Sequence, residues 1–293
     1  MHSDTCPTAD TAGVEVAVRG AGAPVLVVHG TPGGIDGARI MGRFLPSDGF
    51  RVVALSRPGY LGTSLDPARA SLDDEADRYV AVLDRLGIDR AAVLAWSGGG
   101  PAAYRFAARH PDRVRSLVVA AGLSGRWVPP SPGPLEWVVT STRVGAALAT
   151  VAARLAPATV IRAAEAGVSS LRGAELRDHV RGVLADPVRR AFVLDLATTG
   201  NASGAHRPGW DNDVRNLGAL TDLGLRDVHV PTLLVHGDAD TDVDPAHSAR
   251  AAAQVPGAEL VTLPGGTHFA LWAHRDAASV QERVRRHLRL GLS

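Results

Sequence analysis

A serine set among glycines is the residue of this chain best suited to nucleophilic chemistry. The sequence WSGGG places Ser97 between an apolar run at 91–95, typical of a buried strand, and a helix-like stretch at 101–106. A side chain on such a tight strand-to-helix turn sits on strained backbone, and its neighbours must be small. Ala95 and Gly99 meet that requirement. The pattern predicts a nucleophile elbow, Gly-x-Ser-x-Gly with alanine in the first position, while an ordinary glycine-rich loop is the alternative.

A second glycine-rich segment, HGTPGG at 29–34, follows another buried strand. Its glycines would let backbone N–H groups point at an anionic oxygen, as acyl transfer requires. We expect the backbone amides of Thr31 and Gly98 to be these donors, forming an oxyanion hole. A phosphate-binding loop is the alternative, but the segment has neither the Gly-x-Gly-x-x-Gly pattern nor the lysine of a P-loop.

Carboxylates and a histidine follow the last two predicted strands. HGDADTDVDP at 236–245 carries four aspartates, and the glycine-flanked GGTHF at 265–269 carries His268. A calcium site is one interpretation, but calcium loops spread their ligands over a longer turn, and Asp244 before Pro245 is typical of a helix cap. One carboxylate is enough to orient an imidazole. Serine, aspartate and histidine in this chain order form one of three convergent triad arrangements.

The composition excludes several other chemistries. All 31 residues counted as Lys+Arg are arginines, which rules out Schiff-base chemistry, a Ser-Lys dyad and a P-loop. The single cysteine, Cys6, allows no intrachain disulfide, cysteine zinc site or iron–sulfur cluster. The net charge of +1 comes without a basic patch, which disfavours nucleic acid as a partner. We expect a small-molecule substrate, no metal and no other cofactor.

No segment has the pattern of a targeting or membrane signal. The first residues lack a basic patch followed by an apolar run, and no uncharged stretch approaches a membrane-spanning length. We therefore expect a cytoplasmic protein without a membrane partner, acting as a monomer or homodimer.

Short apolar runs alternate with helix-like segments through both ends of the chain. A run at 14–18 alternates at period two, as a half-exposed strand does, whereas runs at 25–28 and 52–55 are continuously apolar, as strands buried on both faces are. Ser71 is typical of the N-cap of a helix ending near Gly87. This alternation favours a parallel sheet with helices on both faces. Further strands are predicted at 92–95, 116–120, 232–235 and 259–263, and further helices at 38–45, 101–109 and 276–290.

The alternation stops between residues 123 and 228. That region contains the proline-rich PPSPGP at 129–134 and then has helical and loop patterns, without a convincing buried strand. We interpret it as a helical insertion. We expect a core domain of residues 1–122 and 229–293 and a cap, or lid, of residues 123–228.

In these features the sequence resembles the α/β-hydrolase superfamily. Five segments match its motifs in order: HGTPG at 29–33, RPGYLGTS at 57–64, the elbow, GDAD at 237–240 and GTHF at 266–269. The resemblance implies a mostly parallel, eight-stranded sheet with helices on both faces and a helical cap inserted after the sixth strand.

The resemblance also implies roles for single residues. The family's acid usually stands three residues after the glycine that matches Gly237, which selects Asp240 from the four aspartates. Some members carry the acid before the cap instead, where this chain has no carboxylate at 122–124. His268 would draw the proton from Ser97, and Ser97 would attack a carbonyl. Serine at the elbow disfavours dehalogenase and epoxide-hydrolase reactions, for which relatives use aspartate there.

We expect the substrate to be a medium-sized, mainly apolar ester, thioester or lactone. Aromatic residues near the motifs and in the cap could bind it, although cap aromatics are also typical of a cap core. His29 and His236 precede glycine turns and are expected to be structural hydrogen-bonding residues. The expected substrate-binding residues are Trp96, Trp127, Trp137 and Phe269.

Three alternatives use the same fold. A proline iminopeptidase-like aminopeptidase would need an anionic anchor for the amino group of its substrate, such as Glu136, Glu165 or Glu175. Cofactor-free haloperoxidase-like or lyase-like activity could use the same triad. The non-enzyme alternative is a ligand-binding receptor or scaffold, and an intact triad weighs against it.

Overall fold

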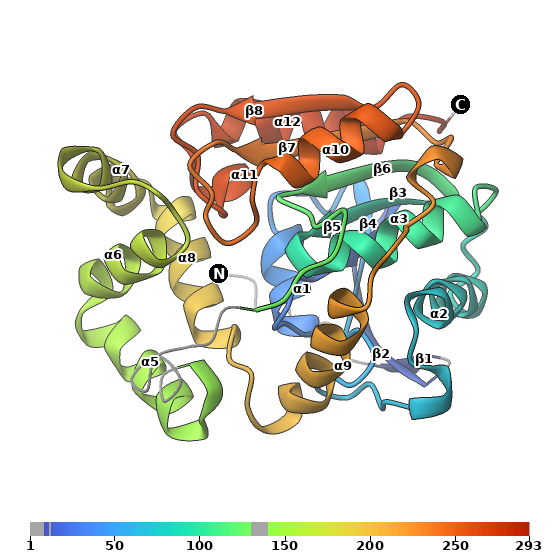
Figure 1. The fold of residues 1–293 in the computed structure, drawn as a ribbon, viewed down its shortest axis with the longest axis horizontal. Helices are drawn as coiled ribbons and strands as arrows, with labels where there is room; N and C mark the ends of the chain where they lie inside the picture. Colours follow the sequence, from blue (N-terminus) through green and yellow to red (C-terminus); the bar gives the residue numbers. More distant parts are fainter. Residues whose placement is uncertain (1–8, 12, 130–139, 293) are drawn as a thin grey trace.

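The computed structural model describes residues 9–11, 13–129 and 140–292, and within them eight strands form one sheet. The strand order is β1-β2-β4-β3-β5-β6-β7-β8 (Figure 1). β1 and β2 pair in antiparallel fashion, and the other six strands are parallel to one another. The strands are β1 (Ala9–Thr11), β2 (Val14–Arg19), β3 (Ala23–Val28), β4 (Phe50–Leu55), β5 (Ala91–Trp96), β6 (Val114–Ala120), β7 (Thr232–Gly237) and β8 (Glu259–Leu263).

The central strands are continuously apolar because helices cover both faces of the sheet. Val25 and Val27 of β3 pack into the hydrophobic cluster on one face, and Leu26 and Val28 pack into the cluster on the other. This is the alternation of side chains that a strand imposes. The predicted α/β-hydrolase architecture, a mostly parallel sheet between helices, is confirmed.

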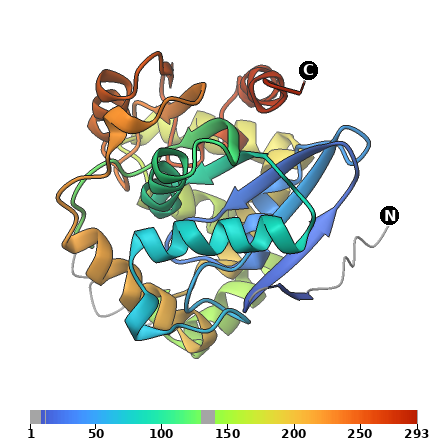
Figure 2. The ribbon, with the colours of Figure 1, turned by 90° about the vertical axis from the view of Figure 1, so that its right-hand side faces the viewer.

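Six helices of the core lie on the two faces. α1, α11 and α12 pack on one face, and α2, α3 and α10 pack on the other, so that the sheet separates α2 from the C-terminal helix (Figure 2). The helices are α1 (Ile35–Gly42), α2 (Leu72–Arg85), α3 (Gly100–Arg109), α10 (Ala246–Gln254), α11 (Ala270–Ala273) and α12 (Ala277–Leu288).

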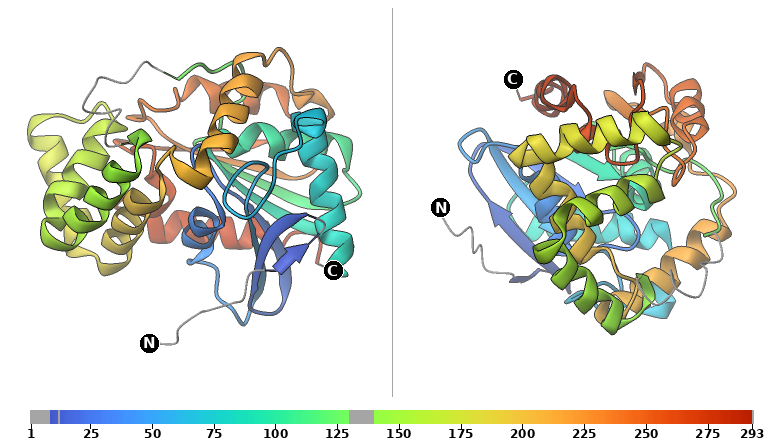
Figure 3. Two further views of the ribbon diagram at one scale, coloured as in Figure 1. Left: turned by 90° about the horizontal axis from the view of Figure 1, so that it is seen from below. Right: turned by 90° about the vertical axis from the view of Figure 1, so that its left-hand side faces the viewer.

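Between β6 and β7 the described residues form helices and loops and no strand of the sheet. Four of them, α5 to α8, stand together beside one end of the sheet and are called the cap helices below (Figures 1 and 3). α8 connects them to the core, because Phe192 stacks on Trp272 of α11 with ring centroids 4.8 Å apart. α9 lies apart from the cap helices and docks on the core. Their bounds are α5 (Arg143–Leu155), α6 (Pro157–Gly167), α7 (Gly173–Ala185), α8 (Pro187–Thr199) and α9 (Arg207–Gly218).

Local signals fix several helix ends. Ser71 and Asp74 form a capping box at the start of α2, as the N-cap pattern predicts. α1 begins at Ile35, three residues before the predicted start, because the N–H of Ile35 donates to the Ser56 hydroxyl at 2.9 Å. The short strand β1 was not predicted, since three residues carry too little pattern. No helix among the described residues is both long and apolar enough to cross a membrane.

Candidate active site

Ser97 occupies a strained turn where β5 meets the short helix η2 (Ser97–Gly99) and then α3. Its φ of +53° lies in the left-handed region, which costs a non-glycine residue about 1–3 kcal/mol. The loop after β3 presses against this turn. A Cβ on Gly99 would lie 2.4 Å from the carbonyl oxygen of His29, and a Cβ on Gly30 would lie 3.0 Å from Cβ of Ser97. Glycine at these two positions therefore permits the close approach that holds the serine in place.

The two expected oxyanion donors lie side by side. A Cβ on Gly98 would be 3.4 Å from the backbone nitrogen of Thr31. The N–H of Thr31 has no acceptor among the described residues. Gly98 stands at the second position of η2, where a backbone N–H has no acceptor within the helix. Both amides are therefore free to donate to an anionic oxygen beside Ser97.

The loops after β7 and β8 bring Asp240 and His268 into contact. Nδ1 of His268 donates to Oδ2 of Asp240 at 2.7 Å. Oδ1 of Asp240 accepts the backbone N–H groups of Asp242 and Val243, at 2.9 and 3.0 Å. Of the four aspartates in this segment, Asp240 is the one hydrogen-bonded to Nδ1 of His268. Its carboxylate has a fixed orientation because both oxygens are engaged.

A second histidine supports the same carboxylate. Nε2 of His236 lies 3.1 Å from Oδ2 of Asp240 and 3.0 Å from the carbonyl oxygen of Val243, so it carries the hydrogen and donates. Its Nδ1 is 2.6 Å from the Ser248 hydroxyl of α10. His29 is likewise hydrogen-bonded on both ring nitrogens. The prediction that these two histidines serve as structural hydrogen-bonding residues is confirmed.

The electrostatics of this pair favour the charged forms. Burial alone would raise the pKa of Asp240, but the charge of His268 and hydrogen bonds from both histidines hold that pKa well below its usual range. Burial alone would lower the pKa of His268, but the carboxylates of Asp240 and Asp242 raise it to about 8. With a pKa of about 8, the imidazole is largely uncharged only above about pH 8, and the uncharged form is the one that can act as a base.

The other nitrogen of His268 faces a carboxylate as well. Nε2 lies 3.3 Å from Oδ2 of Asp242, whose side chain is 47% exposed. Within the described part of the chain, no hydrogen bond joins Ser97 Oγ to His268. Such nucleophile–base bonds are often loose without substrate and tighten in the complex.

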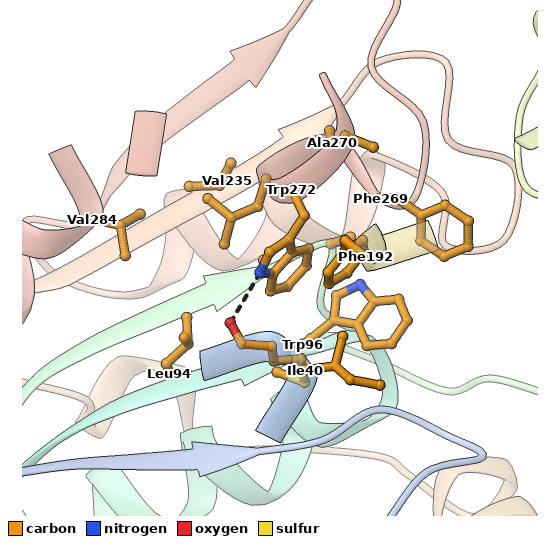
Figure 4. Packing of buried hydrophobic residues seen from close by; sticks show 14 of the residues in the cluster. Ile40, Leu94, Trp96, Phe192, Val235, Phe269, Ala270, Trp272 and Val284 are labelled. Atoms are coloured by element: carbon orange, nitrogen blue, oxygen red, sulfur yellow. Dashed lines mark hydrogen bonds between the residues drawn. The ribbon is translucent and has the colours of Figure 1, made fainter. Parts of the chain in front are cut away.

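The rings of Trp96, Phe192, Phe269 and Trp272 lie close together (Figure 4), and those of Trp96 and Phe269 lie beside His268. Trp96, next to Ser97, donates its indole N–H to the carbonyl oxygen of His268 at 3.2 Å, and its ring lies 5.0 Å from the imidazole. Phe269 lies beside both rings, at 6.0 and 6.1 Å. Trp96 therefore holds the elbow and the histidine loop together.

Trp127 and Trp137, the two other tryptophans predicted to bind substrate, belong to the segment between β6 and β7. Trp127 is half-buried, packs edge-on against Trp210 of α9 and contacts the cluster that contains Val243, just after the acid loop. Trp137 lies outside the described residues.

A buried charged cluster behind the loop after β3 was not predicted. The Arg57 guanidinium, 1% exposed, pairs with Glu75 of α2 at 2.7 Å and with Asp213 of α9 at 2.8 Å. Asp213 also accepts the hydroxyls of Tyr60 and Thr31, at 2.7 and 2.5 Å. Burial alone would lower the pKa of Arg57, but the two carboxylates raise that pKa well above its ordinary value. The only sequence signal was Arg57 in the RPGYLGTS motif directly after a buried strand.

Comparison with known proteins decides the family. The sequence profile described as alpha/beta hydrolase fold matches residues 23–274. The chain belongs to this family. An alpha/beta hydrolase fold protein from Nakamurella multipartita has a solved structure that is 42% identical, with a TM-score of 0.93, over 97% of this chain and 98% of that one.

The alignments of this α/β hydrolase with two curated relatives extend over most of both chains. The uncharacterized hydrolase YcgS of Bacillus subtilis (strain 168) is 26% identical over 92% of this chain and 93% of its own. The 2-hydroxy-6-oxononadienedioate/2-hydroxy-6-oxononatrienedioate hydrolase 2 of Pseudomonas putida is 27% identical over 86% of this chain and 83% of its own. Both relatives are named as hydrolases.

Proposed function

We propose that this α/β hydrolase is a serine hydrolase that cleaves an ester, thioester or lactone bond through an acyl-enzyme on Ser97. The observation that carries the proposal is the 2.7 Å bond between Asp240 and Nδ1 of His268, on the loop that Trp96 ties to the Ser97 turn. A histidine oriented by a carboxylate, on a loop tied to the strained turn that carries a serine, is the arrangement that can activate a hydroxyl for attack.

The chemistry follows from these positions. Ser97 Oγ bonds to the carbonyl carbon of the substrate, and the hydroxyl proton passes to Nε2 of His268. The electron pair of the carbonyl double bond moves to the carbonyl oxygen, which accepts hydrogen bonds from the backbone N–H groups of Thr31 and Gly98. When the intermediate collapses, the carbon–oxygen or carbon–sulfur bond breaks and His268 returns the proton to the leaving alcohol or thiol. Water then attacks the acyl group by the same steps and frees Ser97. Asp240 keeps the tautomer and stabilises the imidazolium.

The aromatic rings beside His268 support a substrate whose acyl part is mainly apolar. Trp96 and Phe269 place two aromatic rings within 5.0 and 6.1 Å of the imidazole. Neither ring carries a charge that would have to be desolvated when an apolar acyl chain binds. Trp127 is proposed as a further contact from the segment between β6 and β7.

The described cap carboxylates do not favour the aminopeptidase alternative. Glu165 is fully buried in α6, where it lies 3.0 Å from Nε2 of His179, so its carboxylate is not accessible to the amino group of a substrate. Glu175 lines a cavity of about 730 Å³ whose lining includes neither Ser97 nor His268. Glu136 lies outside the described residues.

A panel of substrates tests the proposal. Aryl esters of short to medium acyl chains are assayed beside proline arylamides, with the wild type, Ser97→Ala and His268→Ala. We expect ester cleavage by the wild type and a loss of about 10⁴-fold or more in each variant. Cleavage of the arylamides alone, or of no member of the panel, would overturn the proposal.

A further inference from the structure

Asp242 places a half-exposed carboxylate next to Nε2 of His268, the nitrogen that carries the proton in the proposed mechanism. Its Oδ2 lies 3.3 Å from Nε2, whereas Asp240 occupies Nδ1. In the proposed mechanism Nε2 is the atom that returns a proton to the leaving group. A carboxylate 3.3 Å from that atom therefore lies beside the leaving group.

The backbone fixes this position. The N–H of Asp242 donates to Asp240 at 2.9 Å, and the preceding residue, Thr241, donates to the carbonyl oxygen of Val168 in the loop between α6 and α7 at 3.2 Å. The following residue, Val243, is buried against Leu123 and Leu217. Asp242 is thus held between two anchored neighbours, at the boundary between the core and the cap helices.

The charges around His268 are negative in sum. Among the described residues, Asp240 and Asp242 are the charged groups that act on the imidazole. The charge of the imidazolium offsets that of one carboxylate, and the other carboxylate stays uncompensated. Asp240 is buried, so the carboxylate that a substrate can reach is the half-exposed Asp242.

We propose that Asp242 forms a cation subsite and makes the protein select substrates whose leaving group carries a positively charged ammonium. Opposite charges a few ångströms apart attract each other more strongly in a partly buried site than in bulk water. A leaving group with an ammonium therefore binds this site more tightly, and one with a carboxylate binds it more weakly. Asp242 is therefore a specificity-determining residue. This inference rests on the proposed serine-hydrolase function.

Three acetate esters of similar size separate charge from shape. The alcohol parts are choline, which is cationic, 3,3-dimethylbutanol, its neutral isostere, and an aliphatic hydroxy acid of similar length, which is anionic. kcat/KM is measured for each at low ionic strength with the wild type, Asp242→Asn and Asp244→Asn. Asp244→Asn is the matched control, because Asp244 lies two residues away and its substitution removes the same net charge. Oδ1 of Asp244 accepts the N–H of Ala246, the first residue of α10, at 2.8 Å, and asparagine can accept it too.

We expect the wild type and Asp244→Asn to prefer the choline ester over its neutral isostere by about five- to tenfold, and to cleave the anionic ester most slowly. In Asp242→Asn the ratio of choline to neutral ester falls to about one. The ratio removes any effect that the variant has on His268, because such an effect acts on all three esters. Added salt should reduce the preference of the wild type.

The outcomes distinguish this inference from the proposed function. Cleavage of the neutral ester with no charge preference, or with the same preference in Asp242→Asn as in the wild type, overturns the cation subsite and leaves the serine hydrolase standing. Cleavage of none of the esters, together with no fluorophosphonate label on Ser97, overturns both. Protection of Ser97 from fluorophosphonate by choline but not by 3,3-dimethylbutanol, lost in Asp242→Asn, supports the subsite by binding alone.

Discussion

Thr31 donates its hydroxyl to Oδ2 of Asp213 over 2.5 Å, which ties the loop after β3 to α9. Asp213 is held in turn by both Nη atoms of Arg57, at 2.9 and 2.8 Å. The loop that carries the Thr31 amide is therefore positioned by a buried charged cluster. The segment between β6 and β7 thus contributes a contact to the site from α9.

Removal of Asp213 is expected to destabilise the fold. In Asp213→Ala, Arg57 stays buried with only Glu75 as a charged partner, and losing one member of a buried ion pair costs about 3–5 kcal/mol. Urea unfolding of both proteins measures the loss. Asp211→Ala is the control on the same helix, since its exposed pair with Arg207 is worth about 1 kcal/mol or less. Equal losses in the two variants would contradict a structural role for the cluster.

The Thr31 hydroxyl is expected to matter for rate. Thr31→Val keeps the backbone amide but breaks the bond to Asp213, so the amide moves relative to Ser97. Complete removal of one oxyanion donor costs about 10²–10³-fold in kcat, and we expect the displaced donor to cost about tenfold, mainly in kcat. Thr31→Ser retains a hydroxyl and should restore most of the rate. A Val variant as fast as the wild type would show that Asp213 does not position the amide.

Gly99 should tolerate no side chain. In Gly99→Ala the new Cβ would lie 2.4 Å from a backbone oxygen of His29, which cannot rotate away, so we expect a loss of about 1–3 kcal/mol or more in unfolding free energy. Gly182→Ala, in α7, provides the opposite case. Its Cβ meets nothing within 4 Å, and alanine should stabilise the helix by up to about 1 kcal/mol. Thermal unfolding of the two variants checks both signs.

Activity should rise with pH through the titration of His268. Asp240 and Asp242 raise its pKa to about 8, and the base must be neutral to accept the proton of Ser97. We expect kcat/KM for a neutral ester to increase with a midpoint near pH 8, and Asp242→Asn to move the midpoint to lower pH while Asp244→Asn leaves it in place. A midpoint unchanged in Asp242→Asn would contradict the contact at Nε2.

The same pKa has the opposite consequence for stability. Because the folded-state pKa of about 8 lies above the ordinary value of 6.5, the charged His268 stabilises the fold fully below about pH 6.5. This contribution, about 2 kcal/mol, is lost as the pH rises through about 8. Urea unfolding of the wild type and His268→Gln at pH 6 and pH 9 measures this contribution. If the unfolding free energy changes by the same amount between the two pH values in both proteins, the pH dependence comes from other groups.

The strands and the motif positions were predictable because their signals are local. Continuous apolar runs mark strands buried on both faces, and glycines mark the turns that follow them, so HGTPGG, WSGGG and GGTHF could be placed at strand ends. The choice of Asp240 among four aspartates came from the family resemblance. In the structure its hydrogen bond to Nδ1 of His268 agrees with that choice.

Contacts between distant segments were not predictable. Asp213 lies 156 positions from Arg57, on a helix of the insertion, and no spacing or period connects the two. Asp242 and Nε2 of His268 meet only because the loops after β7 and β8 fold against each other, where Gly237 and Gly266 approach too closely for any side chain. Phe192 of α8 stacks on Trp272 of α11, and no local pattern indicates that these two distant residues meet.

The central claim is that Ser97 is an activated nucleophile, and intact-mass analysis after treatment with a fluorophosphonate tests it most directly. The wild type and Ser97→Ala are treated side by side under native conditions. The wild type should gain the mass of one phosphonyl group and Ser97→Ala should gain none. An unlabelled wild type, or equal labelling of Ser97→Ala, would contradict the assignment of Ser97.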